Sequence, residues 1–170
     1  MWDALLVEFR PFVQTGLFAL TAIYALLKCD WPEKAASLIF VGAILLDELH
    51  HALFPEGIYD QVNVGHLIID AIMLFALIQL AMRANRIYPL WILAAQLIAT
   101  AMHLERGLLS AIHPFAYWTL TRLPSYLQLA TLCAGIVAHR LRIKRGIRVK
   151  PWRTSSKPSS ARQERMPLID

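Results

Sequence analysis

The chain has 170 residues, of which 57% are apolar and only 17% are charged, and its mean hydropathy is +0.47. Soluble domains contain roughly 45–50% apolar and about 25% charged residues. The composition therefore argues against a disordered chain, a collagen-like fibre and a disulfide-rich secreted module, and the length suits one domain.

Five apolar segments are candidates for membrane spans, each of which needs about 20 residues of helix. We expect them at residues 9–27, 35–54, 64–83, 89–109 and 117–139. The connections between the first four are short, and short connections make consecutive helices antiparallel neighbours. The sequence thus predicts an all-α, polytopic integral membrane bundle of about five transmembrane helices within residues 1–147.

The positive charges are unevenly distributed along the chain. Residues 140–170 contain ten Lys and Arg and two acidic residues, whereas the rest of the chain contains seven and ten. Lys28, Lys34, Arg83 and Arg86 lie in the connections that share a side with this C-terminal region in a five-span bundle. Since Lys and Arg favour the cytoplasmic side, we predict an N-out, C-in topology.

Residues 148–170 are rich in Ser, Pro, Lys and Arg, which predicts a basic, disordered cytoplasmic tail that meets anionic lipid. Trp152 is the tail's single aromatic residue, which argues against nucleic acid as a partner. The segment from Asn85 to Trp91 resembles span ends of small bacterial membrane proteins, a resemblance that implies no function. From the five spans we expect a multi-pass protein of the cell membrane, namely the bacterial inner membrane.

Ionisable residues occupy the outer third of the second, third and fourth segments. Asp47 and His51 are spaced i, i+4, as are His66 and Asp70, so each pair lies on one helix face. Asp47 and Asp70 are about equally many residues from the turn between the second and third segments, so we expect them at similar depth in the membrane. Because charges in lipid gather where they pair or hold an ion, we predict an outward-facing site. The expected ligands are Asp47, Glu48, His51, His66, Asp70 and His103, with His50 and Glu105 around them.

Several chemistries fit such a site. Imidazoles and carboxylates from three helices bind transition metals or relay protons, and facing imidazoles such as His66 and His103 hold haem. Glu48 and His51 have the E-x-x-H spacing of half a di-iron site, but the second such motif is absent. Alternatively, the helices end early and these groups are ordinary ion pairs in the headgroup zone.

No motif of a hydrolase, a zincin or a nucleotide-binding enzyme occurs, so the sequence gives an enzymatic role no support. A small protein without such motifs is also typical of a non-catalytic accessory or scaffold subunit, bound to a membrane-protein partner or to a second copy of itself. A pore-forming protein is a weaker alternative, because no clear continuous polar stripe runs through the segments.

Overall fold

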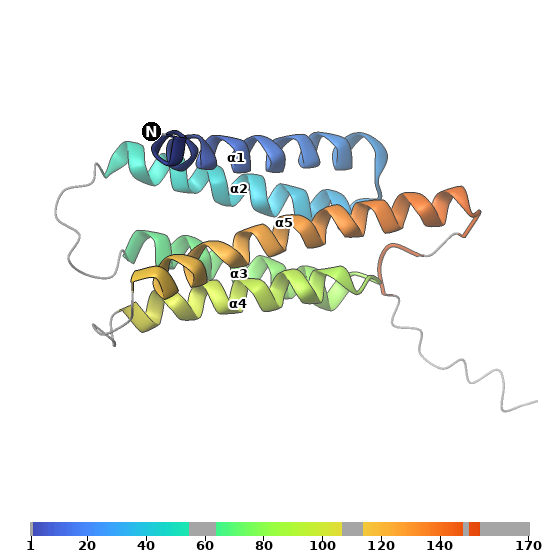
Figure 1. Cartoon of the computed structure of the whole chain (residues 1–170). Helices are drawn as coiled ribbons and strands as arrows, with labels where there is room; N and C mark the ends of the chain where they lie inside the picture. The colour runs from blue at the N-terminus through green and yellow to red at the C-terminus, as the bar shows by residue number, and fades with distance from the viewer. Residues whose placement is uncertain (1, 55–63, 107–113, 148–149, 154–170) are drawn as a thin grey trace, which may run out of the picture.

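The structure is a computed structural model, and it describes residues 2–54, 64–106, 114–147 and 150–153. Side chains are described within these ranges for 12–54, 64–102, 123–147 and 150–153. The described residues form an all-helical bundle (Figure 1), which confirms the all-α part of the predicted fold class. Its helices are α1 (Trp2–Lys28), α2 (Trp31–Leu53), α3 (Val64–Arg83), α4 (Tyr88–Arg106) and α5 (Pro114–Lys144).

Proline and glycine explain several of the helix ends. Pro32 lies in the first turn of α2, where its missing N–H would have had no helical partner. Pro124 lies inside α5, which continues through it as the predicted segment 117–139 implies, and α5 extends beyond that segment at both ends. Gly146 has a φ of 72°, and the N–H of Ile147 donates to the carbonyl of Arg142 at 3.0 Å. This left-handed position ends α5 and turns the chain back towards the bundle.

Consecutive helices are neighbours throughout the bundle. The pairs α1–α2, α2–α3, α3–α4 and α4–α5 pack together, and α5 also contacts α2 and, less extensively, α1. Figure 1 shows that the α1–α2 and α3–α4 connections lie with the C-terminal end of α5 at one end of the bundle. The end of α2 and the start of α3 therefore lie together at the opposite end.

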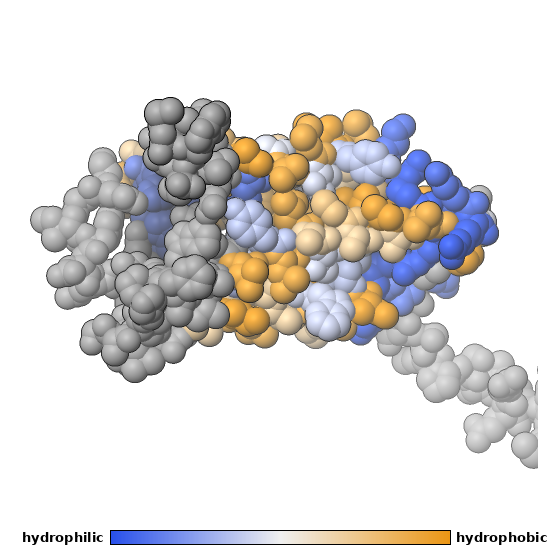
Figure 2. Space-filling view, in the orientation of Figure 1, coloured by the Kyte–Doolittle hydropathy of each residue, from blue (hydrophilic) through white to orange (hydrophobic). Residues whose placement is uncertain are grey.

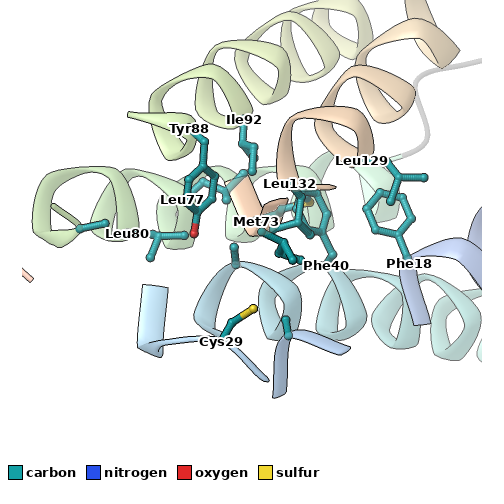
Figure 3. Packing of buried hydrophobic residues seen from close by; sticks show 14 residues of the cluster. Phe18, Cys29, Phe40, Met73, Leu77, Leu80, Tyr88, Ile92, Leu129 and Leu132 are labelled. Carbon is teal, nitrogen blue, oxygen red and sulfur yellow. The ribbon is translucent and has the colours of Figure 1, made fainter. Parts of the chain in front are cut away.

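A compact apolar core joins the helices (Figure 3). Leu77 of α3, Ile92 of α4 and Leu132 of α5 are completely buried. Phe18 of α1 stacks against Phe40 of α2 with ring centroids 4.8 Å apart. Side chains from all five helices reach this core or its margin, which holds them in register.

The outer surface of the bundle is also apolar. Helices α2 and α3 are long and apolar enough to cross a membrane, judged by length and composition. Only 17% and 22% of their most apolar stretches are buried inside the bundle, and large apolar side chains such as Leu38, Leu45, Ile68 and Phe75 are exposed. Figure 2 shows apolar residues over the middle of the molecule and hydrophilic residues gathered where α5 ends.

A short C-terminal segment packs against the α3–α4 connection. Ala84 and Trp152 form an antiparallel bridge, the N–H of Asn85 donates to the carbonyl of Pro151 at 2.9 Å, and the N–H of Arg153 donates to that of Arg83 at 2.8 Å. These C-terminal residues belong to the segment for which the sequence predicts disorder. The other positions of that segment, 148–149 and 154–170, lie outside the described residues.

Candidate metal centre

Three histidines meet where α2 ends and α3 begins. His50 and His51 lie in the last turn of α2, and His66 lies in the first turn of α3. One ring nitrogen from each of the three lies within 4.8 Å of the others. The His66 ring centroid is 5.1 Å from that of His50 and 5.0 Å from that of His51. We call these three residues the histidine cluster.

Asp47 links this cluster across the α2–α3 interface. Its Oδ1 lies 3.1 Å from Nε2 of His66, and its Oδ2 lies 3.9 Å from Nε2 of His51, one helical turn away. A carboxylate that accepts from one imidazole nitrogen fixes the ring orientation and leaves the other nitrogen with its lone pair for a metal. The arrangement is therefore that of a histidine ligand supported by a carboxylate.

Gly65 allows His50 to approach α3. A Cβ atom at this position would overlap the imidazole of His50, with Cε1 only 2.8 Å away and two further ring atoms closer. The close approach leaves Nδ1 of His50 buried without a hydrogen-bond partner among the described residues. A buried nitrogen of this kind costs free energy unless a proton donor or a metal ion satisfies it.

A cavity of about 260 Å³ leads from the cluster into the bundle. Asp47 and His66 line its outer part, and Asp70, Ser125 and Gln128 line the rest together with apolar residues. Beside it, Nε2 of Gln96 donates to Oδ1 of Asp70 at 3.0 Å, and Nε2 of Gln128 donates to Oε1 of Gln96 at 2.7 Å. Both glutamines are almost fully buried, so the polar environment continues inward from the histidine cluster.

The structure brings together most of the residues that the sequence singles out. Asp47, His51 and His66 are in contact, and Asp70 lines the same cavity. His50, expected at the periphery, belongs to the cluster itself. Glu48 is exposed, and the group of possible ligands in the described residues does not include it. His103 and Glu105 lie on α4, but their side chains are outside the described part of the chain.

A second polar cluster lies at the opposite end of the bundle, and the sequence reasoning missed it. Nε of Arg86 lies 3.4 Å from Oε1 of Glu33, and Nη2 lies 3.4 Å from Oδ2 of Asp30. Nδ1 of His139 lies 3.7 Å from the same Asp30 oxygen. Glu33 is completely buried. Hydropathy indicates only that Arg86 lies in a cytoplasmic connection. Its ion-pair partners, Asp30 and Glu33, are distant in the sequence and therefore give no local signal.

No family model, curated protein or solved structure matches this chain. The chemistry of the site therefore follows from its donor set. Three imidazoles, one of them supported by a carboxylate, suit Zn²⁺ and neighbouring divalent transition metals, which prefer nitrogen ligands of intermediate softness.

Proposed function

We propose that this chain is a multi-pass protein of the bacterial inner membrane, N-out and C-in, whose histidine cluster binds a transition-metal cation. The observation that carries the proposal is the meeting of His50, His51 and His66 beside Asp47 at one end of an otherwise apolar bundle. The proposed ligand is the metal ion by itself, and we assign no reaction to the site.

Two features support the membrane location. Exposed large apolar side chains occur along most of the length of α2 and α3, and contact with water is unfavourable for such side chains whereas contact with lipid is not. Arg140, Lys144 and Arg145 lie at one end, and the histidine cluster lies at the other. An apolar middle with a basic end is typical of a bundle whose basic end faces the cytoplasm.

The geometry favours a metal ion over the other occupants that the sequence suggests. Zn–N bonds of about 2.0–2.1 Å place tetrahedral ligand atoms about 3.4 Å apart, so small side-chain rotations from the observed spacing complete the site. Haem would need a flat space between two imidazoles, which His50, His51 and His66 do not leave among themselves. The expected haem pair of His66 with His103 stays a prediction, because the side chain of His103 lies outside the described residues. Proton transfer through the same residues remains the alternative chemistry, since histidine titrates near neutral pH.

Metal content measured on the full chain, purified in detergent, tests the proposal. After incubation with Zn²⁺ and gel filtration, we expect about one zinc per chain in the wild type. His50→Ala and His66→Ala should each lose most of this zinc, because each removes a ligand. Glu48→Gln is the matched control, since it alters an exposed residue of the same helix. A metal-free wild type, or equal zinc in all variants, would contradict the proposal.

An accessory subunit of a larger membrane complex is the second candidate. Ala130, Ala134 and Ala138, spaced four residues apart on α5, line an open pocket of about 490 Å³ beside Tyr88 and Trp91 of α4. Small residues at this spacing allow close approach of a neighbouring membrane helix. Purification in a mild detergent distinguishes the two functions. A stoichiometric partner with no bound metal favours the subunit, and a metal-loaded chain without a partner favours the cation site.

A further inference from the structure

A pocket of about 490 Å³ lies at the bundle end that is opposite to the histidine cluster. Side chains from three separate parts of the chain line it. Asp30 comes from the α1–α2 connection, Arg86 from the α3–α4 connection, and His139 and Arg142 from α5. The turn at Gly146 closes one side, together with Ile143 and Ile147. We call this the basic pocket, and it shares no residue with the histidine cluster.

Existing contacts already occupy Arg86 and Asp30. Arg86 pairs with Glu33 and Asp30, and its Nη1 donates to the carbonyls of Asn85 at 3.2 Å and Lys150 at 3.5 Å. Asp30 in turn faces both Arg86 and His139 through one oxygen. These groups form one wall of the pocket, in which the single positive charge of Arg86 faces the two carboxylates of Asp30 and Glu33.

Two groups of the basic pocket have capacity left for a ligand. Nε2 of His139 is buried without a hydrogen-bond partner among the described residues, and His139 as a whole is only 3% exposed. Arg142 is half-buried, lines the same pocket and makes no ion pair with any described residue. Since Nδ1 of His139 faces Asp30, protonation of the ring turns Nε2 into a second donor directed away from that contact.

The charges of the surroundings specify the sign of the ligand. Two arginines, Arg86 and Arg142, and one carboxylate, Asp30, line the pocket, so positive charge predominates there, whereas Arg140 and Lys144 line a separate pocket beside α1. A cation would meet both arginines. An anion would instead accept hydrogen bonds from Arg142 and His139. Guanidinium groups bind phosphate oxygens in a bidentate manner, and such charge-assisted bonds are among the strong ones.

We propose that the basic pocket binds a phosphate group. Arg142 and His139 would donate to its oxygens, and Arg86, which Glu33 and Asp30 hold in place, is the second arginine in the lining. The phosphate is either the headgroup of an anionic lipid or a soluble phosphate. This proposal is independent of metal binding by the histidine cluster, because the two sites lie at opposite ends of the bundle.

Thermal unfolding of the full chain in an uncharged detergent measures binding to each source. One titration uses inorganic phosphate, with sodium chloride at equal ionic strength as its control. A second titration uses phosphatidic acid in the micelle, with diacylglycerol as the matched lipid that lacks the phosphate. We expect a saturable rise in Tm with at least one of the two phosphates and none with either control. A rise with phosphatidic acid alone identifies the lipid headgroup as the source, and a rise with inorganic phosphate identifies the soluble one.

Arginine variants then separate a defined pocket from diffuse attraction to a basic surface. Arg142→Gln should weaken binding about tenfold or more, because it removes a direct charge-assisted contact. Arg145→Gln removes the same charge from an exposed neighbouring position that does not line the pocket, and it should change binding less than about twofold. His139→Gln should weaken binding in a variant whose own Tm shows that it folds. Equal losses in the two arginine variants, or no saturable binding of either phosphate, would overturn the proposal.

Discussion

Oδ1 of Asp47 on α2 lies 3.1 Å from Nε2 of His66 on α3. This contact joins two helices next to the connection between them, and it orients the one histidine of the cluster that α3 contributes. Because His50 and His51 come from the preceding helix, the cluster exists only when α2 and α3 pack in this register. Metal affinity should therefore report on this interface.

The charge of Asp47 should be necessary for tight metal binding. In Asp47→Asn, the amide cannot stabilise the positive charge that develops on a metal-bound imidazole, so we expect Zn²⁺ affinity to fall about 10–100-fold. Competition with a chromogenic chelator measures the affinity. Glu48→Gln, the exposed neighbour, should stay within about twofold of wild type, as expected for a solvated charge. Equal affinities of Asp47→Asn and wild type would exclude a supporting role for this carboxylate.

The absence of a side chain at Gly65 should leave the room that His50 needs in order to bind the metal. In Gly65→Ala the added methyl group overlaps the imidazole, so His50 must rotate away and Zn²⁺ affinity should fall about tenfold or more. Gly42→Ala on α2 is the matched control, because nothing lies within 4 Å of a Cβ there. It should leave zinc binding unchanged and stabilise the helix by up to about 1 kcal/mol. The same chelator titration, with Tm as a folding check, compares the two. If Gly65→Ala retains wild-type affinity, His50 is not a ligand.

Removal of Arg86 should strongly destabilise the fold. Arg86→Met leaves the completely buried carboxylate of Glu33 without its partner, which costs about 3–5 kcal/mol in comparable buried pairs. Unfolding in a denaturing detergent measures the change. Arg83→Met, which removes an exposed charge from the last turn of α3 nearby, should cost no more than about 0.5 kcal/mol. Adding Glu33→Met to Arg86→Met should restore much of the loss, and a double variant less stable than the single one would contradict this explanation.

Cys29 should react slowly and in a pH-dependent manner. It lies between α1 and α2, where burial and the nearby Glu33 carboxylate raise its pKa to about 11. Only the thiolate reacts, and it makes up about 0.1% of such a thiol at pH 8. In Cys133→Ser, alkylation by N-ethylmaleimide should therefore be slow at pH 8 and accelerate about tenfold per pH unit up to pH 10. In the unfolded chain the thiol of Cys29 has its ordinary pKa, so it should react fast already at pH 8. A folded-state rate that does not depend on pH would show that access, not ionisation, limits the reaction.

Length, hydropathy and the short connections are enough to predict five antiparallel helices, since these properties are local. The predicted segment 64–83 matches the bounds of α3. The i, i+4 spacing also predicts that Asp47 lies beside His51. His66 is expected close to them because it lies about as far from the α2–α3 connection as His51 does, on the neighbouring helix. The full extent of α5 does not follow from these local properties, because the helix runs from Pro114 to Lys144 and extends beyond the predicted segment 117–139 at both ends.

Only the tertiary structure decides which polar residues share a site. His50 enters the cluster because Gly65, on a different helix, leaves room for its ring. Asp30, Arg86 and His139 meet because α5 returns along the bundle to the two basic connections. Helical periodicity determines which residues share a face of one helix. It carries no information about which faces of distant helices are turned towards each other, because packing of the whole core sets that rotation.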